Sequence, residues 1–188
     1  VRRHHRACLA ANRLAVNVRL MVVFPANRAN LQARRLHDRI VNRLRGSCEM
    51  VRRRRVEPHE PGPYRVVGEV TPRAFLGVDA YPTDDARIEI GFRLETEVSH
   101  EHYWCSWIEP ERRLLIGWHQ DGTHDDRGPA HLQLDSGRSV VERQAATFID
   151  AHPLAVVARR LASLPAVVEG VAWEDGEPVG IEIAAEDG

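Results

Sequence analysis

The sequence predicts an α+β fold, in which an antiparallel meander sheet is packed by one or two C-terminal helices and followed by a C-terminal hairpin. Two observations carry this prediction. Short segments between residues 64 and 135 alternate apolar and polar side chains, which is typical of strands with one buried and one solvated face. After residue 150 the apolar residues recur with the period of a helix. With 188 residues, of which 43% are hydrophobic, residues 64–188 are expected to form a single domain.

The strand pattern is clearest between Arg87 and Val98, where apolar side chains alternate with arginine and glutamate. Polar turns separate this segment from others of the same kind, so consecutive strands are expected to pair as a meander. The other expected strands are Tyr64–Val70, His102–Glu109, Leu114–Gln120 and Ala130–Asp135, with Arg73–Val78 as an optional one.

The C-terminal third of the chain predicts helices and a hairpin. Pro153 is placed at a helix start, and the apolar residues after it recur at helical spacing, so this helix is expected to cover one sheet face. Ser139, with Glu142 three residues later, predicts the cap of a shorter helix before it. A hairpin is expected within Val167–Ala184, with its turn at Asp175–Gly176.

Charge divides the chain into two unlike segments. Residues 1–49 contain 11 arginines and two acidic residues, a net charge of +9. Residues 50–188 contain 15 arginines and 25 acidic residues, a net charge of −10. The chain has no lysine, a composition for which a GC-rich coding sequence is the simplest cause. The negative net charge of residues 50–188 bears on solubility and not on the fold.

Residues 1–49 form a basic extension with two interpretations. An apolar residue at every fourth position from Leu36 to Leu44 predicts a helix over Asn30–Arg45, whose basic face suits nucleic acid or an acidic partner. Alternatively, the extension is a disordered or solvated tail, or it is not native and the protein starts at Met50. Residues 50–63 are expected to link the extension to the domain, because prolines gather at their end.

The cysteines and the apolar segments predict the cellular compartment of the protein. Cys8, Cys48 and Cys105 are far apart and form no C-x-x-C pair, so neither a disulfide framework nor a thiolate zinc site is expected, and a reducing cytoplasm fits best. The apolar run Leu14–Phe24 is short and contains a charge, so no membrane segment is expected. Cys105 is expected to be a small buried residue that points away from His102.

The candidate site lies between Leu114 and Asp135, where three histidines and four aspartates fall around two expected strands. Because residues two apart on a strand share a face, His119 and His131 are expected to face each other if their strands pair. The loop between them and the segment after them supply further candidates, two as catalytic groups and two as phosphate ligands. These are Asp121 and His124, then Arg127 and Arg138.

Three interpretations of this cluster stay open. Histidines with carboxylates suit a divalent metal that activates a water for hydrolysis. Two histidines without a metal suit general acid–base catalysis on an RNA 2′-hydroxyl and its leaving oxygen. The third interpretation is a solvated turn without function, because aspartate and glycine favour turns for backbone reasons alone. His100 and His102 also have metal-ligand spacing, but they form only one such pair.

Other motifs narrow the classes of function. No glycine-rich phosphate loop, G-x-S-x-G elbow or H-E-x-x-H motif occurs, so no nucleotide cofactor, serine hydrolase or zincin chemistry is expected. The aromatic residues of two expected strands are either a stacking surface for nucleobases or core packing. They are Tyr103, Trp104, Trp107 and Trp118.

An apolar strand that ends in an aromatic residue, then a His/Asp/Gly loop, then a strand with histidine, resembles the TumE family of toxins from toxin–antitoxin pairs. The matching residues are Ile116, Gly117, Trp118, His119, Asp121, Gly122, His124, Asp125 and His131, followed by Phe148 and the helix after Pro153. The resemblance covers roughly a third of the chain. It implies a small prokaryotic α+β protein, a toxin-like ribonuclease or hydrolase, and an antitoxin-like partner. The alternative is a non-enzymatic module that binds another protein.

Overall fold

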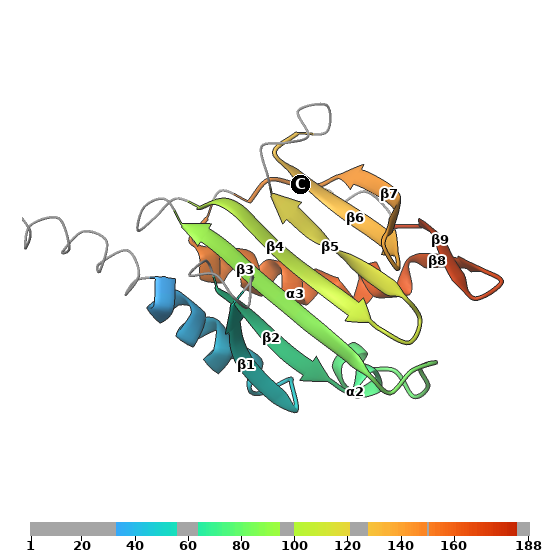
Figure 1. Cartoon of the computed structure of the whole chain (residues 1–188), viewed down its shortest axis with the longest axis horizontal. Coiled ribbons are helices and arrows are strands. Elements are labelled where there is room, and N and C mark those ends of the chain that lie inside the picture. Colours follow the sequence, from blue (N-terminus) through green and yellow to red (C-terminus); the bar gives the residue numbers. More distant parts are fainter. Residues whose placement is uncertain (1–32, 56–63, 95–99, 121–127, 150, 184–188) are drawn as a thin grey trace, which may run out of the picture.

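The structure, a computed structural model, describes residues 33–55, 64–94, 100–120, 128–149 and 151–183. Its centre is a seven-stranded antiparallel sheet whose strands pair in chain order (Figure 1). The predicted α+β class and the meander are therefore confirmed. The strands are β1 (Met50–Arg55), β2 (Tyr64–Val70), β3 (Ala86–Leu94), β4 (His100–Glu109), β5 (Leu114–Gln120), β6 (Ala130–Ser136) and β7 (Ser139–Ala145).

The alternation of side chains gives the sheet an inner and an outer face. The inner face carries buried residues such as Ile90, Cys105 and Trp118, which lie opposite one another on β3, β4 and β5. Helix α3 (Pro153–Glu169) packs on this face and lies behind the strands in Figure 1. The outer face carries the intervening residues, among them Trp104 and His119. It is the face on which the sequence placed the candidate site.

The N-terminal helix, described over residues 33–44, belongs to the core. Leu36, Ile40 and Leu44 are buried, as their spacing predicts, and Leu44 approaches Gly68 on the inner face. Residues of this helix and of α3 line one cavity, so the two helices are neighbours. The arginines of the helix are exposed, which confirms its basic polar face. Among the described residues, no helix combines the length and the apolar character that crossing a bilayer requires.

Local residue preferences explain the start of helix α3 and the turn of the C-terminal hairpin. Pro153 occupies the first helical turn, and the ring of His152 accepts a hydrogen bond from the Leu154 N–H at 3.2 Å. The hairpin of β8 (Val171–Glu174) and β9 (Glu177–Ile181) turns through Asp175 and Gly176, whose φ angles are 50° and 83°. Positive φ at both residues is what a two-residue hairpin turn needs. The predicted hairpin is confirmed, but its first residues belong to α3.

Two predicted elements are wrong. Most of Arg73–Val78, the optional strand, belongs to helix α2 (Pro72–Leu76), because Pro72 favours a first helical turn and Gly77, with φ of 73°, ends it. Ser139 caps no helix but starts β7, since Gly137 with φ of 62° reverses the chain directly onto β6. The carboxylate of Glu142 instead accepts a hydrogen bond from the Ile181 N–H at 2.8 Å. One C-terminal helix packs the sheet.

The predicted linker begins later than expected. Residues 50–55 form β1, which pairs with β2 along its whole length. Its arginines alternate between the two faces, and Arg52 pairs with Glu69 of the neighbouring strand. A run of four arginines therefore serves as an edge strand, where charged side chains reach water and discourage pairing with other chains. The rest of the predicted linker, residues 56–63, lies outside the described residues.

Gly117 tests how tightly β4 and β5 approach. A Cβ at Gly117 would lie 2.4 Å from the Cys105 carbonyl oxygen and 2.5 Å from the Ser106 Cα, so the backbone itself must move. We expect Gly117→Ala to lower the free energy of unfolding by about 1–3 kcal/mol. Gly46→Ala is the matched control, because no atom lies within 4 Å of the added carbon. Urea denaturation of both variants checks this, and equal stabilities would contradict the close approach.

Candidate functional site

The pairing of β5 with β6 brings His119 and His131 together on the outer face. They are direct cross-strand partners, and their rings stack with centroids 5.6 Å apart and planes at 16°. The expected encounter of the two histidines is confirmed. His119 is partly exposed, whereas His131 is only 1% exposed. Their backbone neighbours Trp118 and Leu132 point to the inner face, so core packing fixes the register of the pair.

Trp104 lies beside the histidine pair in the same cross-strand row. It is the partner of Gly91 on one side and of His119 on the other. A Cβ at Gly91 would come within 2.1 Å of the Trp104 Cζ2 atom, so the indole lies against the glycine backbone. Tyr103, Trp107 and Trp118 are buried on the inner face and serve core packing. Of the four aromatic candidates, Trp104 alone stands on the outer face, where it is partly exposed.

A short polar chain continues from the histidines along β6. The Gln133 amide donates to both carboxylate oxygens of Asp135, at 2.9 and 3.0 Å, and accepts from Arg143 Nε at 2.7 Å. Burial raises the pKa of Asp135, and the hydrogen bond from Gln133 and the charge of Arg143 oppose that rise. Asp135 is four residues from His131, about 13 Å along the strand, so it does not orient the imidazoles. Arg143 lies nearer to the pair.

The two arginines predicted as phosphate ligands are not both brought to the pair. Arg138 is exposed in the turn after β6, about 20 Å from His131 along the strand. Asp121, His124 and Arg127 lie outside the described residues. Arg143, which the sequence analysis missed, is on the outer face, diagonal to His131. The wrong prediction of a helix at Ser139 concealed it, because a strand there places Arg143 next to β6.

The described residues include no cluster suited to a metal. No three histidine, cysteine, aspartate or glutamate side chains among them come together in a metal-like group. His102 faces Arg93 across the strand pair, and the His100 side chain lies outside the described residues. A guanidinium beside His102 is an unfavourable neighbour for a cation.

The outer face is more basic than the chain as a whole. The register of the strands puts six arginines and three carboxylates on it among the described residues. Arg65 and Arg87 both pair with Glu89, each at 3.0 Å. The net charge of these groups is +3, although residues 50–188 carry −10. The groups are Arg52, Arg54, Arg65, Arg87, Arg93 and Arg143 against Glu69, Glu89 and Asp135.

The two described cysteines are free thiols of low reactivity. Cys105 is buried on the inner face, opposite His102, as expected, and burial raises its pKa to about 12. Burial also raises the pKa of the half-buried Cys48, to about 11. Cys105 and His102 therefore cannot form a nucleophilic pair, because a thiol and its base must share a face.

Thiol labelling provides a direct check of these environments. At pH 8 both thiols stay protonated, because their pKa values lie above the pH, and only the thiolate reacts. We expect a maleimide to leave Cys105 unmodified in the folded chain, to modify Cys48 slowly, and to modify both at once in urea. Peptide mass spectrometry separates the two sites. Rapid labelling of Cys105 in the folded protein would contradict its burial.

Comparison of the chain with protein-family models, curated proteins and solved structures gives no match.

Proposed function

We propose that the protein is a ribonuclease that cleaves RNA by general acid–base catalysis at His119 and His131. The observation that carries this proposal is the stacked histidine pair on the face of the sheet that the described helices leave uncovered. Such cleavage requires one group that takes the proton of the 2′-hydroxyl and another that protonates the departing 5′-oxygen. Two imidazoles side by side satisfy this need without a cofactor.

The stacking geometry favours the state in which only one of the two rings is an imidazolium. Two imidazolium charges 5.6 Å apart repel by about 3 kcal/mol at an effective dielectric constant of 20. Protonation of both rings at once is therefore disfavoured. A singly protonated pair consists of one base and one acid, which is the state that the reaction uses.

Burial assigns the two roles. His131 is only 1% exposed and His119 is partly exposed, and a neutral ring is cheaper to bury than a charged one, so the side chains over His131 must move aside when RNA binds. His131 is then the base that accepts the 2′-hydroxyl proton while the 2′-oxygen attacks phosphorus. The bond from phosphorus to the 5′-oxygen breaks, and His119 gives its proton to that oxygen. The products are a 2′,3′-cyclic phosphate and a 5′-hydroxyl, and the histidines exchange protonation states.

The outer face supplies the means to hold RNA. Trp104 presents an aromatic ring next to His119, and stacking a base on such a ring contributes about 1–3 kcal/mol. The arginines of the outer face offset the acidic character of the body where the phosphates would lie. Arg143, diagonal to His131, is the described arginine best placed to contact the scissile phosphate.

The biological setting belongs to the same proposal. A ribonuclease of this size with the TumE-like loop pattern suits a prokaryotic toxin that a protein partner holds in check. We place its action in a reducing cytoplasm, which is supported by the free thiols of Cys48 and Cys105.

The dependence of cleavage on pH tests whether one histidine acts as the base and the other as the acid. We expect kcat/KM for a short RNA to follow a bell between about pH 5 and 8, because activity is lost at low pH when the base is protonated and at high pH when the acid is deprotonated. Initial rates across that range at constant ionic strength measure it. A rate that rises steadily with pH, as a hydroxide-driven reaction does, would contradict the two-histidine mechanism.

A non-enzymatic protein-binding module is the second candidate, favoured by the edge strand β7. Its Val140 and Val141 are 47% and 36% exposed, and among the described strands it pairs only with β6. Such an edge suits the addition of a strand from a partner. Val141→Lys would abolish partner binding by this route and leave RNA cleavage intact, whereas His119→Ala would do the opposite.

A further inference from the structure

One row of cross-strand partners crosses the outer face of the sheet. Helix α3 lies behind the strands in Figure 1, so the figure shows this face. Directly opposite residues on successive strands point to the same side, and each register pair therefore adds one member to the row. From β1 to β6 the members are Arg54, Arg65, Gly91, Trp104, His119 and His131. Ala145 of β7 completes the row beyond His131.

The β1 end of the row is positively charged. Arg54 is the direct cross-strand partner of Arg65, and like charges in such positions repel. Arg65 is paired with Glu89 at 3.0 Å, whereas Arg54 is exposed and has no ion pair among the described residues. No member of the row is a carboxylate. A phosphate at this end would therefore meet two arginines and relieve their repulsion.

Trp104 lies between the charged end of the row and the histidines. It is the partner of His119, about 5 Å away across one strand spacing. Three of its ring atoms would lie 2.1–2.5 Å from a Cβ at Gly91, so only a glycine lets the indole lie this close to β3. The side chain is partly exposed. The base of an unpaired nucleotide can stack on such a ring, whereas the bases of a duplex are already stacked on one another.

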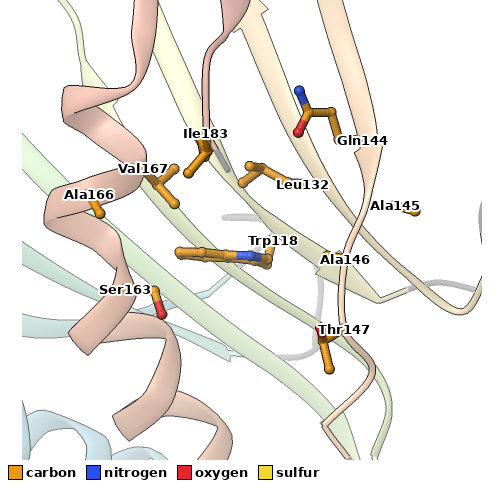
Figure 2. Close-up of a pocket in the computed structure, with 10 residues that line it drawn as sticks. All are labelled: Trp118, Leu132, Gln144, Ala145, Ala146, Thr147, Ser163, Ala166, Val167 and Ile183. Carbon is orange, nitrogen blue, oxygen red and sulfur yellow. The ribbon is translucent and has the colours of Figure 1, made fainter. Parts of the chain in front are cut away.

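Core packing holds the histidine end of the row in place. The sequence neighbours of the two histidines, Trp118 and Leu132, are buried and point towards α3 on the inner face (Figure 2). The guanidinium of Arg160 from α3 lies 4.9 Å from the centroid of the Trp118 ring. A surface that is fixed before its ligand arrives loses little conformational entropy on binding.

The spacing of the strands converts the row into a number of nucleotides. With strands about 4.8 Å apart, Arg65 lies about 14 Å and Arg54 about 19 Å from His119. Phosphates of an extended strand follow one another at roughly 6 Å, so these distances correspond to about two and three nucleotides. Beyond His131, only the uncharged Ala145 remains. The row therefore has room for several nucleotides on one side of the histidines and for little on the other.

The acid and the base set the direction of the strand. Under the proposed mechanism His119 protonates the departing 5′-oxygen, which belongs to the nucleotide on the 3′ side of the cut. This nucleotide therefore lies on the His119 side of the scissile phosphate, next to Trp104. His131 accepts the 2′-hydroxyl proton of the nucleotide on the 5′ side, which lies towards Ala145.

We propose that a single strand of RNA lies along this row, with the nucleotides on the 3′ side of the cut running from His119 over Trp104 to Arg65 and Arg54. The first base on that side stacks on Trp104, and phosphates farther along contact the two arginines. The direction of the strand rests on the proposed ribonuclease function, whereas its path rests on the register of the sheet and on the charges of the row.

Two substrates of opposite asymmetry test the direction. Each is an oligodeoxynucleotide with a single ribonucleotide. The first has one deoxynucleotide before the ribonucleotide and four after it, and the second has four before and one after. We expect kcat/KM to be about tenfold higher for the first substrate, because its longer arm reaches the arginines.

Arg54→Ala should lower kcat/KM for the first substrate about three- to tenfold, through a higher KM, and leave the second substrate unaffected. Arg54 is a cleaner probe than Arg65, because removal of Arg65 would take a partner from the buried Glu89. Arg159→Ala is the control and should change neither rate, since Arg159 is an exposed arginine of α3, which packs on the inner face.

Binding of an oligonucleotide that resists this cleavage tests the path without catalysis. Fluorescence anisotropy gives the Kd of the full chain for a labelled 2′-O-methyl RNA hexamer. Arg54→Glu and Trp104→Ala should each weaken binding about fivefold or more, and Arg159→Glu should not. A blunt duplex of the same sequence should bind the parent more weakly. Circular dichroism checks that each variant is folded.

The two experiments separate the possible failures. Equal cleavage of both substrates, or faster cleavage of the second, would overturn the direction and leave the ribonuclease function standing. Cleavage of neither substrate by the folded parent would overturn the ribonuclease function and the direction together. Undiminished hexamer binding by folded Arg54→Glu and Trp104→Ala, or equal binding of the duplex, would overturn the single-stranded path whatever the cleavage result.

Discussion

His119→Ala and His131→Ala are each expected to lower kcat/KM for RNA cleavage by about 100- to 10,000-fold, which is the contribution of a positioned acid or base. Each substitution removes one of the two proton transfers and leaves the sheet intact. The double variant should be little slower than either single variant, because two residues that act in one step are not additive. Rates on a short RNA, measured with protein whose folding is checked by circular dichroism, give the comparison.

His102→Ala is the matched control for these variants. His102 is a partly exposed histidine on the same outer face, but it faces Arg93 and not the stacked pair. We expect it to retain nearly full activity. Arg138→Ala, at the far end of β6, should also retain activity, whereas Arg143→Ala should raise KM through loss of a phosphate contact. Equal losses in all of these variants would point to general damage and contradict the assigned site.

Glu109→Ala is expected to produce the largest loss of stability, about 3–5 kcal/mol, because it leaves the partners of a buried carboxylate without their acceptor. The Glu109 side chain is 0% exposed and pairs with Arg112 at 2.9 Å. Trp107 Nε1 and the Tyr81 hydroxyl also donate to it, at 2.6 and 2.5 Å. Burial, followed by the neighbouring Glu109, raises the pKa of Tyr81, so that hydroxyl stays protonated and keeps donating.

The same network ties the sheet to the C-terminal hairpin. Arg112 lies over the Trp173 ring of β8, with its guanidinium carbon 3.6 Å from the ring centroid. Loss of Glu109 therefore destabilises the packing of the hairpin as well as the core. The Tm should fall by roughly 10 °C. Glu177→Ala is the control, since its pair with Arg113 is half exposed and is expected to contribute no more than about 1 kcal/mol. Equal losses in the two variants would contradict the special role of Glu109.

The central strands could be predicted because each has a buried face that imposes alternation. Ile88, Ile90 and Phe92 display that pattern in sequence and are buried together. The two edge strands lack it. Four of the six residues of β1 are arginines, and β7 exposes Val140 and Val141, so neither strand shows the alternation of a half-buried strand. Both segments are strands because they pair with a neighbouring strand. Such pairing depends on tertiary structure and cannot be recognised from the local sequence pattern.

The candidate site was predictable to the extent that strand geometry governs it. The parity of β5 and β6 placed His119 and His131 on one face, and the register confirmed their contact. Arg143 could not be found, because its place depends on β7. The position of Trp104 against Gly91 was equally hidden, since alternation assigns a face but not the neighbour across the strand.

The two-histidine mechanism is tested most directly by cleavage of an oligodeoxynucleotide that contains one ribonucleotide. The chain is incubated with this strand and with its all-deoxy counterpart, and the products are identified by mass spectrometry. The two-histidine mechanism predicts a single cut on the 3′ side of the ribonucleotide, a 2′,3′-cyclic phosphate end, an intact all-deoxy strand, and no cut by His119→Ala or His131→Ala. No cleavage of the ribonucleotide strand by the folded parent, or cleavage that survives loss of both histidines, would contradict it.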